Sequence, residues 1–560
     1  MNPPTPALVA QRAVERLPRP VLLVFCAAYL LPGLFGRDPW RNADLTAFGY
    51  MLGMAEGRMS WWAPSLGQLP AETALLPHWI GALAIQWSSP WLDPALAARL
   101  PFGAMLAVTL ALIWYATYHL AKTDAAQPVP FAFGGEAEPV AYARALADGA
   151  LLATVASLGL LQMGHETTPE LLQLMLMALL MWSLAAAPAD RPSSKIAALL
   201  CLPALALSGA PSVAMALGCL AMPLSQRSQH PGVRSLWKWL LAGLLVAAAL
   251  ASFTGAWQWR ISLRGAAEHW LGFARQVLWF TWPVLPLSLW TLWRWRGHWA
   301  QRHLAIPLVT IGVACASSIM MAGSDRALLL AMPGMAILAA FALPTLKRSA
   351  GAAMDWFSVF FFSLAALAIW VTYLSMQIGV PAQPTRNILR LAPGFEPRYS
   401  AVALGFALVA TAAWVALVRW RTSRHRHPLW KSLVLPASGV ALSWLLTMTL
   451  LLPVLDYARS TRALVAQIKR SVPPGSCLSA PGLPRAHVAG LEVFGSFKVD
   501  AREQPGTSDT GCTYRLSLSR KAGQAPDSGW EVLARLRRPA DRNEYFTLSR
   551  RIKAAEPAQN

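Results

Sequence analysis

GRDPWRNADLTAFGYMLGMAEGRMSWWAPSLGQLPAE, residues 36–72, gathers charge in a chain that otherwise carries little of it. Only 13% of the 560 residues are charged, whereas a soluble protein carries about 25%. This stretch nevertheless contains four carboxylates and three arginines, which are Asp38, Asp44, Glu56 and Glu72 with Arg37, Arg41 and Arg58. Because long apolar segments surround it, we interpret it as a loop that the rest of the chain holds at a membrane surface.

The chain around this loop is built of apolar segments. Hydrophobic residues make up 55% of the sequence and the mean hydropathy is +0.41. Apolar runs of roughly 17–24 residues recur, which is the length that a helix needs to cross a bilayer. The sequence therefore predicts an all-α polytopic membrane protein with about 13 transmembrane helices. The predicted spans are 20–36, 100–121, 143–162, 169–187, 195–209, 211–226, 236–255, 277–294, 303–321, 326–344, 355–378, 401–419 and 431–453.

Two segments leave the number of spans open. The run 73–88 is interrupted by Pro77 and His78, so we predict that it lies in the membrane interface and does not cross it. The segment 207–212 (LSGAPS) separates two short predicted spans, and a single long tilted helix across it is the alternative.

The distribution of cations predicts the topology. The net charge is +21, and the basic residues cluster in short loops that alternate with apolar spans, as the positive-inside rule describes. We find no nucleic-acid-binding motif and no continuous basic face, so we expect contact with membrane lipids and not with nucleic acid. If residues 1–19 are a cytoplasmic segment, the outer side receives the loop 37–99, the turns 165–170 and 323–326, the loops 257–275 and 379–400, and the tail.

The tail, residues 454–560, differs in composition from the transmembrane domain 20–453. It is polar, opens with a helical stretch at 455–471, and contains short alternating runs at 491–499 and 512–518 between turns. We predict a small periplasmic domain that is α/β or mostly β. Its two cysteines, Cys477 and Cys512, are expected to form a disulfide in an oxidising compartment, with two free thiols as the alternative. The other four cysteines are interpreted as small buried hydrophobes in spans; they are Cys26, Cys201, Cys219 and Cys315.

Carboxylates at the rim of the bilayer are candidate functional groups, because ionisable side chains are costly there. Asp44 stands just before a predicted helix, so it is either a functional acid or an N-cap. Glu72 follows Pro70 and precedes the interfacial run, so it is either a second functional acid or a helix N-terminal charge. In the turn HETTPE (165–170), Glu166 is a candidate acid beside His165, although an interspan turn needs polar residues in any case. The turn lacks the second histidine of a zinc-protease motif.

Arginines on the same side are candidates for binding phosphate through their planar fork of donors. Arg326, in GSDR at the outer end of a span, is the first candidate, and a snorkelling interfacial side chain is the alternative. Arg260 and Arg264 are spaced by four residues on a predicted interfacial helix. They would bind substrate or simply contact lipid headgroups.

The segment WWAPSLGQLPAETALLPHW (61–79) resembles W-x-x-P-x-L-x-G-x-x-Y-x-E-K-P-P-L-x-Y-W, a motif of the lipid A aminoarabinose transferases and protein O-mannosyltransferases of the GT-C superfamily. The family carries an Asp-Glu pair about twenty residues before that proline, and Asp44 is twenty residues before Pro64. The acid of the motif falls on Glu72. The segment ARLPFGA (98–104) and Arg326 followed by Pro333 also resemble family elements. The predicted spans with an outer C-terminal domain match the aminoarabinose-transferase layout.

The chain departs from this pattern at several positions. Leu45 stands where the second acid of the pair should be, and Ala47 replaces an arginine that members often carry. The Lys-Pro after the motif acid is Thr73-Ala74, and the late tyrosine is absent. These departures are consistent with a diverged specificity or with lost activity.

The resemblance implies a polyprenyl-phosphate sugar donor and transfer with inversion at C1. Asp44 would be the general base for an acceptor hydroxyl, or would orient and charge-stabilise an acceptor that is already anionic. Glu72 would be a second acid that positions the acceptor or binds a divalent metal ion. His78 and His165 are candidate substrate-binding residues. Together with His269 they are also conceivable metal partners, but no ligand spacing supports a metal site.

We therefore expect a bacterial inner-membrane glycosyltransferase that acts at the periplasmic face on a lipid or surface-glycan acceptor, as in lipid A modification. A protein O-glycosyltransferase of the same fold is the alternative within this class. From other classes, the alternatives are a polyprenyl-lipid transporter or flippase, favoured by the 207–212 break, and an inactive assembly subunit, favoured by Leu45 and the missing lysine.

Overall fold

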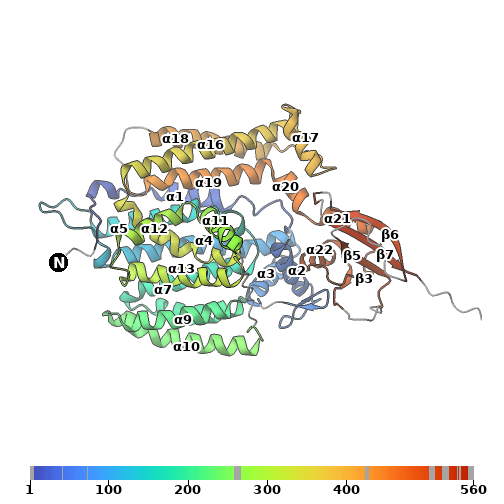
Figure 1. The fold of residues 1–560 in the computed structure, drawn as a ribbon, viewed down its shortest axis with the longest axis horizontal. Helices are drawn as coiled ribbons and strands as arrows, with labels where there is room; N and C mark the ends of the chain where they lie inside the picture. Colours follow the sequence, from blue (N-terminus) through green and yellow to red (C-terminus); the bar gives the residue numbers. More distant parts are fainter. Residues whose placement is uncertain are drawn as a thin grey trace, which may run out of the picture.

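The computed structural model describes residues 5–40, 42–71, 74–257, 267–422, 428–503, 511–519, 529–538, 540–541 and 544–552. It is a bundle of helices with a small sheet domain at one end (Figure 1). Seven of the described helices are long and apolar enough to cross a membrane, so the chain is a multi-pass membrane protein. These are α4 (Pro94–Ala121), α7 (Pro169–Ala186), α10 (Pro231–Phe253), α13 (Arg302–Met320), α16 (Arg348–Ile378), α18 (Ala401–Thr422) and α19 (Lys431–Leu450).

Every other predicted span overlaps a shorter helix or a pair of helices. These are α1 (Arg19–Leu30), α5 (Pro139–Ala156), α8 (Pro192–Leu207), α9 (Pro211–Gln226), the pair α11 (Ala267–Phe280) and α12 (Val284–Arg294), and the pair α14 (Asp325–Leu329) and α15 (Met332–Ala342). Many of these helices begin at a proline, such as Pro139, Pro192 and Pro211. Proline suits the first helical position because its fixed φ is already helical and its missing N–H would have had no partner there.

The break at 207–212 separates two helices, so a single tilted helix is the wrong reading of that segment. α8 ends at Leu207 and α9 begins at Pro211. The carbonyl of Ser208 accepts a hydrogen bond from the Gln173 amide on α7 at 2.8 Å, and the carbonyl of Leu207 accepts one from the backbone N–H of Leu75 at 2.9 Å. The turn is therefore anchored at the end of the bundle that carries the first loop.

The predicted outer and inner segments gather at opposite ends of the bundle. At one end, Arg326 contacts Glu166, and the Tyr457 hydroxyl donates to the carbonyl of Pro393 at 2.7 Å. At the other end, the N-terminal segment pairs with predicted inner loops, because the Leu429 N–H donates to the Ala13 carbonyl at 2.9 Å. Figure 1 shows the N-terminus at the end far from the sheet. The two sets of loops therefore separate as the charge pattern predicts.

The first loop contains two short helices, α2 (Ala43–Ala55) and α3 (Leu76–Ser88), which lie between the bundle and the sheet (Figure 1). α3 falls within the run that was predicted to be interfacial. α2 buries nearly every residue from Asp44 to Met54. Leu45 and Tyr50 on this helix share an apolar core with tail residues such as Val488. The first loop is therefore packed between the bundle and the tail.

The tail continues from α19 through α20 (Leu452–Arg459) and α21 (Arg462–Lys469) into a five-stranded sheet of order β4-β3-β5-β7-β6. Its elements are β3 (Cys477–Ser479), α22 (Arg485–Gly495), β4 (Lys498–Asp500), β5 (Tyr514–Ser519), β6 (Trp530–Arg537) and β7 (Tyr545–Arg551). β3 pairs with β4 and β5 in parallel, whereas β7 pairs with β5 and β6 antiparallel. The α/β prediction is confirmed.

The alternating run 491–499 is part helix and part strand. Its first half is the end of α22, and its second half is β4. Val488, Ala489 and Leu491 are all buried on that helix, so tertiary packing overrides the short period-two pattern. Ser496, with φ of 55°, terminates the helix.

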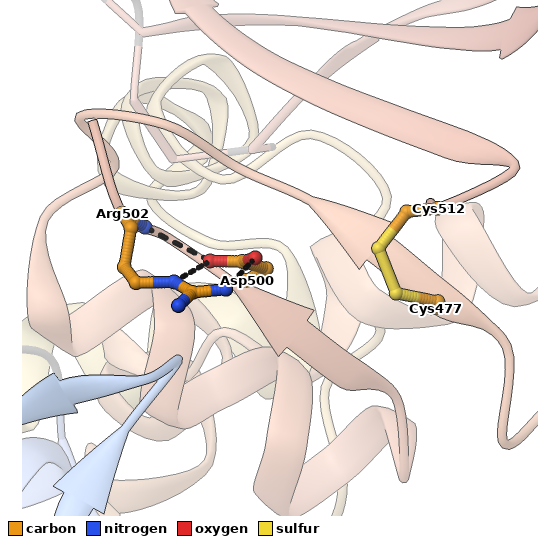
Figure 2. Close-up of a disulfide and its surroundings, with 4 residues drawn as sticks. All are labelled: Cys477, Asp500, Arg502 and Cys512. Carbon is orange, nitrogen blue, oxygen red and sulfur yellow. Dashed lines mark hydrogen bonds and ion pairs between the residues drawn. A yellow bond between two sulfur atoms is a disulfide. The ribbon is translucent and has the colours of Figure 1, made fainter. Parts of the chain in front are cut away.

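Cys477 on β3 and Cys512 just before β5 are joined by a disulfide with their Cα atoms 4.9 Å apart. Figure 2 shows this bond beside the Asp500–Arg502 pair, in which the guanidinium makes hydrogen bonds of 3.0 and 2.8 Å to the carboxylate. Of the four cysteines that were expected to be buried in spans, Cys201 is buried and Cys219 is exposed on the surface of the bundle. The expectation that Cys219 is buried is therefore wrong, because a helix at the rim of the bundle exposes one of its faces.

Replacing Cys477 by Ser is expected to destabilise the tail. The disulfide links residues 35 apart, and closing a loop of that length removes about 4 kcal/mol of unfolded-state entropy. Thermal unfolding of the purified protein should show a lower Tm in the variant, and reduction of the wild type should reproduce the shift. Cys219→Ala is the control and should leave Tm unchanged. An unchanged Tm in Cys477→Ser would contradict the prediction.

Candidate functional site

Asp44 is the centre of a buried polar network at the end of the bundle near the tail. It lies in the first turn of α2 with 1% of its surface exposed. One carboxylate oxygen accepts from the Arg37 guanidinium at 3.0 Å and from the Trp40 N–H at 3.1 Å. The other accepts from both the backbone N–H and the hydroxyl of Thr167, each at 2.8 Å. Asp44 therefore ties the first loop to the HETTPE turn, and the N-cap position belongs to Asn42.

The surroundings of Asp44 keep it charged. Burial alone would raise the pKa of this carboxyl, but the charges of Arg37 and Arg99 and the two Thr167 donors hold the pKa below its usual value. A general base needs a pKa near the working pH and an open lone pair. Four donors already point at Asp44, so its geometry fits an orienting carboxylate better than a general base.

Arg37 is a member of this network to which the sequence reasoning gave no role. Its guanidinium donates to the Gly33 carbonyl at 2.8 Å, to Asp44, and to the His165 carbonyl at 2.6 Å. All three nitrogens are thus engaged. A signal was present in the sequence, because Arg37 begins the charged stretch directly after the first apolar span.

His165 is a structural part of the same turn. Its two ring nitrogens lie 2.8 Å from the Leu161 carbonyl and 2.9 Å from the Tyr29 carbonyl, and the ring packs against Tyr29 and Trp444. Burial is the main cause that lowers its pKa to about 4, against the effect of the two carbonyls. Because a carbonyl oxygen lies beside each ring nitrogen, neither nitrogen is accessible to a metal ion or a substrate.

His78 lies apart from this network. It is 4% exposed on α3, and its ring centroid is 5.0 Å from that of Tyr50. Burial lowers its pKa to about 4. The side chain was predicted to bind substrate, but in the structure it packs in the interface between α2 and α3.

Acidification is expected to destabilise the protein through His78. In an unfolded chain histidine has a pKa of about 6.5, whereas in the folded protein the pKa of His78 is about 4. The unfolded state therefore binds more protons, and stability is lost as the pH falls from about 6.5 towards 4. Thermal unfolding followed over this range should show a smaller loss in His78→Phe than in wild type. Equal pH dependence in the two proteins would refute the assignment.

Glu166 and Arg326 form the second half of the network. An Arg326 nitrogen donates to Glu166 at 2.7 Å, and another lies 3.6 Å from a carboxylate oxygen of Glu170. The Gln162 amide donates to the other oxygen of Glu166 at 2.9 Å. The GSDR turn and the HETTPE turn, which are distant in sequence, are thus joined. The positive charge of Arg326 is thus balanced by the carboxylates of Glu166 and Glu170.

Helix α20 and the residue that follows it contribute three tail residues that the sequence did not single out. Asp456 accepts hydrogen bonds from the Trp40 indole at 2.9 Å and from the Asp38 N–H at 2.8 Å. Arg459 donates to the Gln162 side-chain carbonyl at 2.7 Å. Ser460, which follows the helix, donates to Asp38 at 2.7 Å. No sequence motif marked these residues, because they meet the first loop only through the fold.

A cavity of about 590 Å³ opens beside this network. It lies between the start of the first loop, the segment 394–398 before α18, and helices α20 and α21. Its polar lining includes Asp38, Asp456 and Arg398, and its apolar lining includes Phe395 and Leu452. Asp38 and Asp456 belong both to this cavity and to the contacts around Trp40, so the cavity and the network share a wall.

Several predicted site residues lie outside the part of the chain that the structure describes. These are Glu72, Arg260 and Arg264. Among the described residues, no group of three or more His, Cys, Asp or Glu side chains could hold a metal ion. Together with the engaged ring of His165, this gives the described residues a poor fit to a metal, and no step is assigned to one.

Comparisons with known proteins give a clear result for the fold. No family model matches the sequence, and no curated protein matches it. Among solved structures, the chain is similar to a crystal structure of ArnT from Cupriavidus metallidurans bound to undecaprenyl phosphate. The TM-score is 0.59 and the sequence identity is 15%, and the match covers 96% of this chain and 98% of that one. The apo structure of the same protein gives a TM-score of 0.59 at 14% identity, covering 94% and 98%.

The chain therefore shares the fold of ArnT over nearly the whole of both proteins. ArnT is a lipid A aminoarabinose transferase of GT-C type, so the fold that the sequence resemblance implied is confirmed. At this level of identity, the likeness concerns the arrangement of the helices and the tail domain.

Proposed function

We propose that this protein is a membrane glycosyltransferase that takes a sugar from a polyprenyl-phosphate donor. The observation that carries the proposal is the position of the Asp44–Arg37 and Glu166–Arg326 pairs. Both lie at the end of the bundle next to the tail, in a fold shared with a protein that was crystallised with undecaprenyl phosphate. A donor of this kind needs a long apolar surface for its tail and charged groups at the membrane rim for its phosphate.

The chemistry assigned to this site is a displacement at C1 of the sugar. An acceptor oxygen that is already anionic forms a bond to C1, so no proton has to be removed from it. The bond from C1 to the phosphate oxygen breaks at the same time, and its electron pair leaves with the lipid phosphate. We assign Asp44 the role of holding the first loop and the HETTPE turn in place around the acceptor, with its charge fixed by Arg37. Glu72, outside the described residues, remains our candidate for the acid that positions the acceptor.

The proposed location is the bacterial inner membrane, with the site and the tail domain in the periplasm. The positive-inside pattern supports this side, because the basic loops gather at the end opposite to the tail. The disulfide in the tail also fits an oxidising compartment. The acceptor proposed is a lipid or surface glycan, with lipid A as the first to test, and proteins are the second class of acceptor.

A transfer assay tests the proposal. Purified protein in detergent would be given undecaprenyl-phosphate sugars carrying a radiolabel, with lipid A or a periplasmic protein extract as acceptor. We expect label to move to the lipid acceptor and undecaprenyl phosphate to be released in equal amount. Label on protein would favour the alternative acceptor. No transfer, together with no binding of undecaprenyl phosphate, would reject the function.

A further inference from the structure

Arg459 is a partly exposed cation of the polar network that makes no ion pair with a described carboxylate. Arg37 is paired with Asp44, Arg326 with Glu166, and Arg462 with Asp38. Arg459 has no carboxylate oxygen within 4.0 Å among the described residues, and its side chain donates to the neutral amide of Gln162. Within the described part of the chain, its other guanidinium nitrogens have no hydrogen-bond acceptor, so they are open to a ligand at the end of α20.

Two guanidinium groups, those of Arg37 and Arg459, contact the Trp40 ring and repel each other. The central carbon of Arg459 and that of Arg37 each lie 4.8 Å from the Trp40 ring centroid. Arg37 is held there by Asp44 and by two carbonyls, so its position is fixed. Burial and the charge of Arg37 lower the pKa of Arg459, while Glu166 acts in the opposite direction. An anion beside Arg459 would relieve this repulsion.

The backbone that carries Arg459 is fixed before any ligand arrives. The Arg462 guanidinium donates hydrogen bonds of 2.9 and 2.6 Å to Asp38, and the Ser460 hydroxyl donates to the same carboxylate. These contacts bind the junction of α20 and α21 to the first loop. A preorganised, partly exposed guanidinium whose hydrogen-bond partner is neutral is suited to bind an anion with little ordering cost.

Arg99, the other nearby arginine without a carboxylate at ion-pair distance among the described residues, is unsuited to this role. It is 2% exposed, and its guanidinium donates to the Leu34 carbonyl at 3.3 Å. A ligand at the membrane rim would reach Arg459, which is partly exposed, before it reached Arg99.

We propose that Arg459 binds the phosphate group of the polyprenyl carrier, exchanging its bond to Gln162 for phosphate oxygens while it stays over Trp40. This inference rests on the proposed function and adds a residue of the tail to the donor site. It also explains why the tail is joined to the first loop, since α20 carries a substrate-binding cation across the end of the bundle.

Binding of undecaprenyl phosphate to the purified protein in detergent tests the inference. Arg459→Gln is expected to weaken binding by about tenfold or more, because a charge-assisted hydrogen bond and a full charge are lost. Arg459→Lys keeps the charge without the fork and should fall between this variant and wild type. Arg470→Gln removes an equal charge from an exposed residue that follows α21 directly and should bind as wild type. Thermal unfolding of each variant would verify folding.

Three outcomes would overturn the inference, each in a different way. If wild type binds undecaprenyl phosphate and Arg459→Gln binds it equally well, Arg459 is not a phosphate ligand, although the proposed function survives. If wild type binds undecaprenyl phosphate no better than undecaprenol, the proposed function fails as well. If inorganic phosphate displaces the lipid with similar affinity and in an Arg459-dependent manner, the residue serves a free phosphate and not the carrier.

Discussion

Replacing Asp44 with Asn is expected to reduce sugar transfer by about a hundredfold or more and also to lower the thermal stability. The loss of stability follows from the geometry of the site. Arg37 and Asp44 are both nearly inaccessible, with side chains 2% and 1% exposed. Removing one charge leaves the other buried without a partner, which costs about 3–5 kcal/mol. The assay is transfer from a labelled polyprenyl-phosphate sugar, with Tm measured on the same preparations.

A double variant separates the two effects. Arg37→Gln combined with Asp44→Asn removes both charges and leaves polar groups that can still bond to Thr167 and to one another. Such a change should recover part of the lost stability, because the Arg37–Asp44 pair is removed as a unit and neither of its charges is left buried alone. If the negative charge of Asp44 orients the acceptor, transfer should stay low in the double variant although the protein is stable again.

The opposite pattern would assign Asp44 a purely structural role. In that case the double variant would regain transfer together with stability, and the coupling between the two substitutions would be large in both measurements. A single Asp44→Asn variant that keeps normal transfer would remove Asp44 from the mechanism altogether. Each variant is judged by both its transfer activity and its Tm, so a folding defect is distinguished from a loss of chemistry.

The sequence was sufficient for the layout of the chain because hydropathy and charge act locally. A run such as 100–121 is apolar along its whole length, so it is identified as a span without reference to its neighbours. The positions of the basic loops then predict on which side each span begins, and the described contacts between loops are consistent with two separate ends of the bundle. The resemblance near Pro64 also implied the fold that the structural comparison confirms.

The partners within the site could not be predicted in the same way. Asp44 was singled out, but its contacts with Arg37 and Thr167 depend on how two distant turns meet. His165 has the chemistry of a ligand, and nothing in HETTPE reveals that two carbonyls occupy its ring nitrogens. Arg459 is one basic residue among 48 in the chain. Only the packing of α20 on the first loop distinguishes it from the others.

Leu45 shows how the structure changes the meaning of a departure from the family pattern. In the sequence, this leucine replaces the second acid of an Asp-Glu pair and suggests lost activity. In the structure, its side chain is fully buried and points away from the network, into the core that α2 shares with the tail. The ideal Cβ position of Gly490 on α22 would lie 3.5 Å from a methyl carbon of Leu45. The leucine therefore joins the loop to the tail domain.

Restoring the acid with Leu45→Glu is therefore expected to damage the protein and not to activate it. A carboxylate at this position would be buried among apolar side chains, where an unpaired charge costs several kcal/mol or forces the carboxyl to remain protonated. We expect a lower Tm and earlier proteolytic release of the tail. Leu45→Met, which keeps the volume and the apolar character, should cost less than about 1.5 kcal/mol. If Leu45→Glu were as stable as wild type and transferred sugar faster, residue 45 would face the site, and the chain would be a family member that had lost a catalytic acid.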